Sequence, residues 1–246
     1  MNKIMKILAI DTSNRPLSVA LLEDQTLLAE NTTTVSKNHS VALMPAIEEI
    51  FKQSQLKPEE IDRVVVAQGP GSYTGLRIGV TTAKTLAYSL NKELVGVSSL
   101  AVLAKGVQAD AKTLLVPVFD ARRDNVFAGG YMWDDGQLKN VLPDQHISFS
   151  KLCKQIMGKE VCFIGADVAK FAGQLKELMA GQDYRIASAE SAIPRAFNLG
   201  TLGLLKEAEN VNDFVPRYLR ITQAESQWLK RNPQEGKKHG PYVKKY

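Results

Sequence analysis

The stretch that decides the fold of this chain is residues 69–79, GPGSYTGLRIG. It follows a short β-branched run at residues 64–68 and precedes a helical pattern over residues 76 to about 89, so it joins a strand to a helix. Glycine permits positive φ and close backbone approach, and the first N–H groups of a helix suit an anion. The spacing matches neither a P-loop nor the G-x-G-x-x-G dinucleotide motif. A phosphate site and a purely structural turn are therefore both open.

Small residues recur every fourth position in the helix that follows this loop. Gly75, Gly79, Ala83 and Ala87 share one face, where another backbone can approach closely. The stripe either packs on the chain's own sheet or forms a helix-mediated subunit interface. In the second case, Gly79→Arg is expected to break subunit contacts without unfolding the chain, because a long cation would occupy the contact face.

The elements around this loop follow the order βββαβαβ, with a further helix beginning near residue 99. The runs that predict them are strands at 6–12, 17–23, 27–35, 64–68 and 93–98, and helices at 40–51 and 76–89. This order fits a mixed sheet flanked by helices. It is the ribonuclease-H-like plan of each lobe in the actin, Hsp70 and sugar-kinase superfamily.

The second half of the chain begins with a pattern similar to that of the first. The segment ILAIDTSNRPLSVALLE of the first half and VPVFDARRDNVFAGGYM of the second each give an apolar strand, an Asp, a charged turn and alternating apolar residues. An internal duplication explains this, although two strand-turn-strand units that merely share an Asp are the alternative. Further elements are expected as helices around 150–158, 168–179 and 198–208 and a strand at 161–165.

The net charge of +5, from 31 Lys and Arg against 26 Asp and Glu, lies at one end of the chain. Residues 227–246 carry six Lys or Arg against one Glu, which leaves the remainder balanced. We therefore expect lobes at 1–105 and 106–225 and a basic, disordered tail at 226–246. The tail either adds salt-sensitive affinity for RNA or is a solvated end without a role.

Cysteine usage and hydropathy predict a soluble, cytoplasmic protein. Cys153 and Cys162 are too few for a disulfide framework and are expected to be buried thiols. We find neither an export signal nor an apolar run near the ~18 residues that a membrane span needs, so no membrane association is expected.

Candidate catalytic groups are few. Asp11 and Asp120 end equivalent strands and are either facing carboxylates for a hydrated Mg²⁺ or caps of their own turns. Arg122 and Arg123 stand at the tip of the second hairpin, as a solvated turn or as a contact for substrate or tRNA. The histidines are far apart and form no metal-ligand pair, so no metal site is expected: His39, His146 and His239.

Several of these segments together resemble one family. The segments ILAIDTSNRPLSVALL, HSVALMPAIEEIF, VVAQGPGSYTGLRIGVTTAKTLAYSL, DARRDNVFAGGY and VPRYLR are similar to the TsaB family of bacterial tRNA threonylcarbamoyladenosine biosynthesis proteins. The likeness covers residues 7–229. It implies two ribonuclease-H-like lobes of the actin, Hsp70 and sugar-kinase type, the second degenerate. It also implies a role in making N6-threonylcarbamoyladenosine at position 37 of tRNAs that read codons beginning with A.

The resemblance implies a non-catalytic subunit that supports the catalytic paralogue TsaD, with the ATPase TsaE as a third member. TsaD carries two metal-binding histidines where this chain has Ser99 and Leu103, and neither residue replaces an imidazole. The resemblance further implies a homodimer when the chain is alone, a heterodimer with TsaD, and tRNA contact only through the complex. The alternative is an independent ATP-dependent enzyme of the sugar-kinase superfamily.

The resemblance also bears on the loop and the stripe. Dimerisation through the helices of the first lobe favours the stripe of Gly75, Gly79, Ala83 and Ala87 as the subunit interface. No cofactor is expected to bind tightly, but ATP or ADP with Mg²⁺ is expected at the junction with TsaD. The predicted nucleotide-binding residues are Asp11, Gly69, Gly71, Ser72 and Gly75.

Overall fold

A computed structural model describes residues 4–34 and 38–220, and the predicted tail at 226–246 lies outside them. The first half of the chain forms β1 (Lys6–Asp11), β2 (Leu17–Glu23), β3 (Thr26–Thr33), α1 (His39–Ser54), η1 (Pro58–Glu60), β4 (Arg63–Gly69), α2 (Tyr73–Leu90), β5 (Glu93–Ser98) and α3 (Ser99–Lys105). The second half forms β6 (Leu114–Asp120), β7 (Asn125–Asp134), β8 (Gln137–Ser148), α4 (Phe149–Gln155), β9 (Val161–Ile164), η2 (Ala166–Phe171), α5 (Ala172–Leu178), β10 (Tyr184–Ile186) and α6 (Ala196–Leu204).

The strands form two sheets with the same topology. The first has the order β3-β2-β1-β4-β5 and the second, read from its opposite edge, β8-β7-β6-β9-β10. In each sheet the first strand pairs antiparallel with the second and parallel with the fourth. This repeat confirms the predicted fold class, two ribonuclease-H-like lobes of the actin, Hsp70 and sugar-kinase type, and matches the likeness between the two halves of the sequence.

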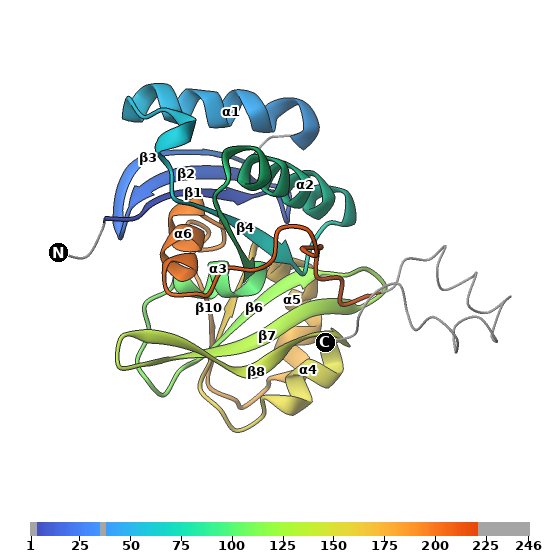
Figure 1. The fold of residues 1–246 in the computed structure, drawn as a ribbon. Coiled ribbons are helices and arrows are strands. Elements are labelled where there is room, and N and C mark those ends of the chain that lie inside the picture. The colour runs from blue at the N-terminus through green and yellow to red at the C-terminus, as the bar shows by residue number, and fades with distance from the viewer. Residues whose placement is uncertain (1–3, 35–37, 221–246) are drawn as a thin grey trace, which may run out of the picture.

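Helices and sheets alternate through the molecule in layers (Figure 1). The helices α1 and α2 cover the outer face of the first sheet, α3 and α6 lie between the two sheets, and α4 and α5 cover the far face of the second. Both faces of the central strands of each sheet are thereby buried. Strand β1 shows the consequence, since Leu8 and Ile10 face the outer helices and Ile7 and Ala9 face α6.

The second lobe is the reduced copy. Its helices α4 and α5 have 7 residues each, against 16 in α1 and 18 in α2. Strand β10 has only 3 residues. Two strands of this lobe, β8 and β10, were not expected from the sequence. The helix expected at 168–179 is instead the 3-10 segment η2 followed by the short helix α5.

The chain returns to the first lobe after the second sheet is complete. Helix α6 packs on β1 and β2, although it belongs to the range 106–225 that we assigned to the second lobe. Arg63 fixes its C-terminal end, because its guanidinium donates to the carbonyl oxygens of Gly203 at 2.7 Å and Leu204 at 3.0 Å. A cation near the C-terminus of a helix also stabilises the helix dipole.

The small-residue stripe of α2 faces the chain's own core. Gly75, Gly79, Ala83 and Ala87 are all buried against the first sheet. A Cβ added at Gly75 would collide with the Thr12 carbonyl oxygen, and one at Gly79 with the Thr12 side chain. The prediction that this stripe is the subunit interface is therefore wrong, because β1 and the turn after it already occupy it. The expectation that Gly79→Arg spares the fold fails for the same reason.

Gly75→Ala should lower the free energy of unfolding by about 1–3 kcal/mol, the usual cost of forcing extra volume into a close-packed site. The added methyl group meets a backbone carbonyl oxygen, which cannot rotate away as a side chain would. Urea denaturation followed by circular dichroism measures the change.

Gly173→Ala is the matched control. Gly173 also lies in a helix, but a Cβ there would meet no atom within 4 Å, so alanine should be neutral or stabilising. Equal effects of the two substitutions would show that helix propensity, and not the contact with Thr12, governs Gly75.

Candidate functional site

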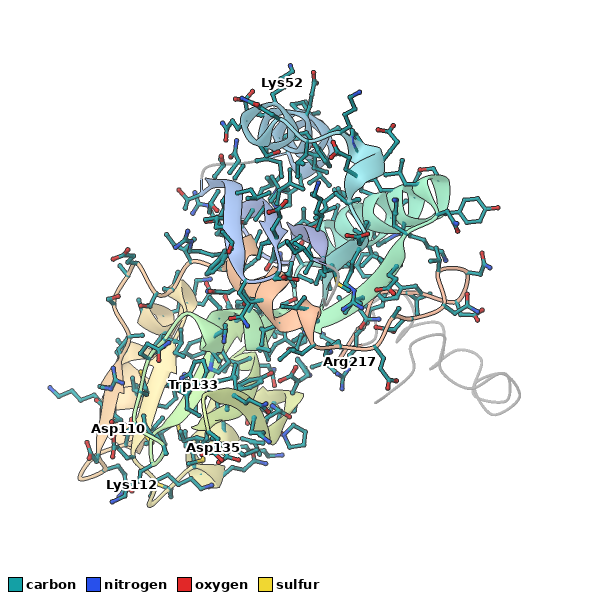
Figure 2. All side chains as sticks on the ribbon, turned by 60° about the vertical axis from the view of Figure 1, so that its left-hand side comes forward. Lys52, Asp110, Lys112, Trp133, Asp135 and Arg217 are labelled. Atoms are coloured by element: carbon teal, nitrogen blue, oxygen red, sulfur yellow. The ribbon has the colours of Figure 1, made fainter. Side chains whose placement is uncertain are left out.

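A cavity of about 770 Å³ lies at the junction of the two lobes. Its walls come from the start of α2 and the loop before it, the β6–β7 turn, and the segment 217–220 near the end of the described chain. Arg217 marks this junction in Figure 2, whereas Lys112 and Asp135 lie at the far end of the second lobe. Residues remote in sequence therefore share one concave surface, the usual setting of a ligand site.

The glycine loop is held against the turn that follows β1. Ser72 N–H donates to the Ser13 carbonyl oxygen at 2.7 Å, and Thr12 Oγ1 donates to the Gly75 carbonyl oxygen at 2.7 Å. A Cβ at Gly71 would collide with the Ser13 carbonyl oxygen. Ser72 Oγ also accepts from Gly75 N–H at 3.3 Å and caps α2. The glycines thus allow two backbones to meet.

The segment near residue 217 occupies the other side of the loop. Arg217 N–H donates to the Gln68 carbonyl oxygen at 2.8 Å, and Gln68 Nε2 donates to the Val215 carbonyl oxygen at 3.0 Å. Gly69, with φ of 127°, lies directly against the Arg217 carbonyl oxygen, where a Cβ would collide. Position 69 is therefore a glycine because the backbone of Arg217 leaves no room for a side chain.

Asp11 lies beneath this assembly, fully buried. Its Oδ1 accepts hydrogen bonds from Ser13 N–H at 2.9 Å and Ser13 Oγ at 2.7 Å, while Oδ2 has no hydrogen-bond partner among the described residues. Burial raises the pKa of the Asp11 carboxyl above its ordinary value. A nucleotide or a hydrated cation in the cavity cannot touch this group.

Asp120 is placed differently. It lines the cavity, its Oδ1 accepts from Arg122 N–H at 2.7 Å, and its Oδ2 pairs with Lys170 Nζ at 2.8 Å. The hydrogen bond from Lys170 lowers the pKa of the Asp120 carboxyl. Each aspartate accepts from the backbone N–H two residues later, so each caps its own turn. The alternative of a facing Mg²⁺ pair is therefore wrong, because Asp11 does not line the cavity that Asp120 lines.

Only two of the five predicted nucleotide-binding residues line the cavity, Gly71 and Ser72. Asp11, Gly69 and Gly75 do not, because backbone packing and burial remove them from it, and the prediction for these three is corrected.

Ser99 and Leu103, the two positions that the resemblance compared with metal-binding histidines of TsaD, are buried as well. Both lie in α3, with at most 1% of their surface exposed. Across residues 4–34 and 38–220, no group of three His, Cys, Asp or Glu side chains could hold a metal ion. Over the same residues, no helix is both long and apolar enough to cross a membrane.

The cavity brings together arginine and tyrosine side chains that the sequence did not connect. The sequence left open whether Arg122 and Arg123 are solvated or contact a ligand. Both line the cavity. Tyr73 stacks on Tyr218 with ring centroids 4.8 Å apart, and burial raises the pKa of Tyr218 to about 12. No local pattern links the segment 217–220, part of VPRYLR, with Tyr73 in the glycine loop.

A buried polar cluster joins the lobes behind the cavity. Ser98, at the end of β5, donates from Oγ to the Asp144 carboxylate, and Tyr131 OH donates to the same carboxylate. Burial raises the pKa of Asp144 and that of Tyr131, while the positive charge of Arg217 opposes both shifts. The cluster ties the first sheet to β7 and β8 and so fixes the relative position of the cavity walls.

Asp11→Asn should gain stability relative to the unaltered chain as the pH rises. The folded-state pKa of Asp11 lies above 3.8, so its stabilising contribution is present below that pH and is lost as the pH rises through the folded pKa. Urea denaturation between about pH 3 and pH 8 measures the difference.

Asp120→Asn is the control with the opposite sign. The folded pKa of Asp120 is lowered, so the ionised group stabilises above 3.8 and its contribution is lost as the pH falls through the folded pKa. Parallel pH profiles of the two variants would contradict the different environments of these carboxyls.

Comparison with known proteins finds relatives described as tRNA threonylcarbamoyladenosine biosynthesis proteins. Residues 27–228 match the family model described as TsaD: tRNA N6-adenosine threonylcarbamoyltransferase. The tRNA threonylcarbamoyladenosine biosynthesis protein TsaB of Bacillus subtilis is 42% identical over 228 residues, which cover 92% of this chain and 98% of that protein. The Escherichia coli TsaB is 33% identical over 53% of this chain and 57% of its own length.

Solved structures support the same fold. The structure described as YeaZ from Pseudomonas aeruginosa superimposes with a TM-score of 0.75 at 23% identity, covering 88% of this chain and 100% of that one. Because the Bacillus subtilis relative matches nearly end to end, the chain belongs to the TsaB family of tRNA threonylcarbamoyladenosine biosynthesis proteins.

Proposed function

We propose that this protein is a non-catalytic, essential subunit of the complex that transfers threonylcarbamoyl to N6 of adenosine 37 in tRNAs reading codons that begin with A. Its membership in the TsaB family supports a role in the biosynthesis of this modification. In the proposal, the chain binds and supports the catalytic paralogue TsaD in the cytoplasm, TsaE is a third member, and tRNA is contacted within the complex.

The proposed non-catalytic role rests on the residues at positions where the paralogue TsaD, or a kinase, would carry reactive or metal-binding groups. Ser99 and Leu103 replace the histidine pair and are buried in α3. Asp11 is enclosed and Asp120 is paired with Lys170, which leaves neither free to hold Mg²⁺. An independent ATP-dependent enzyme of the sugar-kinase type would need both. Calorimetric titration of the isolated protein with Mg-ATP tests that alternative. Binding of ATP together with its turnover would support it.

The partner surface in this proposal is the outer face of the first lobe. A groove of about 650 Å³ runs between α1 and the C-terminal half of α2, and Met44, Phe51 and Leu86 are among the apolar side chains that line it. Val41 and Tyr88 lie exposed on the same two helices. Contiguous exposed apolar surface is typical of protein interfaces. TsaD, or a second copy of this chain when it is alone, would cover this face.

Nucleotide belongs to the junction in this proposal. ATP or ADP with Mg²⁺ would bind where the chain meets TsaD, with groups of TsaD completing the site, rather than tightly to this chain alone. Mg-ATP should accordingly bind the assembled complex more tightly than it binds either subunit.

Modification reconstituted with purified TsaD, TsaE and tRNA should give no N6-threonylcarbamoyladenosine when this chain is omitted. Mass spectrometry of digested tRNA detects the product. Full product without this chain would overturn the proposed function, and so would product from this chain without TsaD.

Met44→Glu should weaken binding to TsaD at least tenfold, or about 1.4 kcal/mol, because it places a charge in the centre of an apolar contact. Sedimentation and pull-down with purified TsaD measure the loss. Met157→Glu is the matched control, since Met157 is 50% exposed and Met44 51%, but Met157 follows α4 in the second lobe. Equal weakening by both variants would exclude this groove as the contact.

A further inference from the structure

The cavity between the lobes has a positive wall. Arg122, Arg123 and Arg220 line it together with two acids, Asp120 and Asp167. Both carboxylates already have a cationic partner, because Lys170 Nζ lies 2.8 Å from an oxygen of each. Arg220 uses one N–H group on the Ala121 carbonyl oxygen at 2.8 Å, which leaves further donors of its guanidinium for a ligand. Such a wall attracts an anion.

Two of these arginines have an unusual backbone. Arg122 and Arg123 adopt φ values of 66° and 53°, and the next residue, Asp124, has 57°. Left-handed conformations are unfavourable for residues that carry a Cβ, so three in succession require support from their surroundings. Asn125 Nδ2 supplies some of it by donating to the Arg123 carbonyl oxygen at 2.8 Å. The turn holds both arginines at the cavity despite this cost.

The cavity also presents an aromatic surface. Tyr73 is 44% exposed, and its ring lies stacked on Tyr218. The guanidinium carbon of Arg77 lies 5.6 Å from the centre of the Tyr73 ring. A flat heterocycle can extend such a stack, and stacking on tyrosine beside arginine is how proteins hold unpaired nucleobases. The ligand that fits therefore carries both phosphates and bases.

The arrangement of the arginines distinguishes a long ligand from a short one. The cavity has a volume of about 770 Å³, and its arginines come from two separate segments, Arg122 and Arg123 from the β6–β7 turn and Arg220 from the segment 217–220. A ligand with several backbone phosphates can contact both segments, whereas a mononucleotide has a phosphate group at one end only.

We propose that this cavity binds a single-stranded segment of RNA, with backbone phosphates on Arg122, Arg123 and Arg220 and a base that extends the Tyr73–Tyr218 stack. The inference rests on the proposed function in one respect, since the RNA in the complex is the tRNA that is modified. It assigns a direct RNA contact to this chain and gives the arginine turn and the tyrosine stack a common role.

The test uses the full chain and a fluorescein-labelled single-stranded RNA of mixed sequence, about 12 nucleotides long. Fluorescence anisotropy gives the binding constant over a range of salt concentrations. The double variant Arg122→Gln/Arg123→Gln removes two charges and keeps a side chain of similar reach. We expect the slope of log K against log salt to become shallower by about 1.4, or about 0.7 for each lost phosphate contact.

A second pair of variants tests stacking. Tyr73→Ala should weaken RNA binding about tenfold, whereas Tyr73→Phe, which keeps the ring, should bind like the unaltered chain. The matched control for charge is Lys112→Gln/Lys139→Gln. Lys112 precedes β6 and Arg122 follows it, so the two lie at opposite ends of that strand. Lys139 pairs with Met132, away from the cavity end of β7. This control should leave the slope unchanged.

Three results would overturn the inference. The first is an unchanged slope in the Arg122→Gln/Arg123→Gln variant with binding abolished by removal of 227–246, which would place RNA on the tail alone. The second is full displacement of the RNA by AMP at equal molar concentration, which would indicate a mononucleotide site. The third is equal displacement by a poly-glutamate peptide, which would indicate an unselective anion surface.

The outcome is separable from that of the proposed function. If modification requires this chain while its RNA affinity is unaffected by the arginine and Tyr73 variants, the proposed function stands and the RNA site fails. If the variants reduce RNA binding as expected while modification proceeds without the chain, the RNA site stands and the proposed function fails.

Discussion

The close approach of the glycine loop to the turn after β1 is the constraint on which the rest of the structure depends. The carbonyl oxygens of Thr12 and Ser13 occupy the space that Cβ atoms would need at Gly75 and Gly71. Two hydrogen bonds, from Thr12 Oγ1 and from Ser72 N–H, hold the backbones together. Helix α2 consequently begins directly over the end of β1, and its first residues form one wall of the interlobe cavity.

The same packing decides which surfaces a ligand or a partner chain can reach. It encloses Asp11 and the small-residue stripe of α2, so neither a cation in the cavity nor a partner chain can reach them. What remains accessible is the outer face, with the apolar groove between α1 and α2, and the interlobe cavity with its arginines and tyrosines. A subunit that acts by docking, and not by its own chemistry, would use surfaces of these two kinds.

The two lobes share a topology but differ in the size of their elements. The first is complete and presents long helices outward, whereas the second has short helices and ends in a three-residue strand. The chain after the second sheet compensates by returning to the first. Helix α6 packs between the sheets, and the segment that follows it bonds to Gln68 and Ala121, one residue from each lobe. These contacts join the lobes in addition to the linker between α3 and β6 and the cluster of Ser98, Tyr131 and Asp144.

The sequence by itself determined the strands of the first lobe, the likeness of the two halves and the family, because these depend on local periodicity and on a long specific motif. It left open whether Asp11 and Asp120 face each other and which way the stripe of α2 points. It did not connect Tyr73 with Tyr218. Only the tertiary structure decided these points, since each depends on which backbone fills the space beside a residue. That neighbour lies 63 positions away for Thr12 and Gly75 and far more for the two tyrosines, beyond the reach of any local pattern.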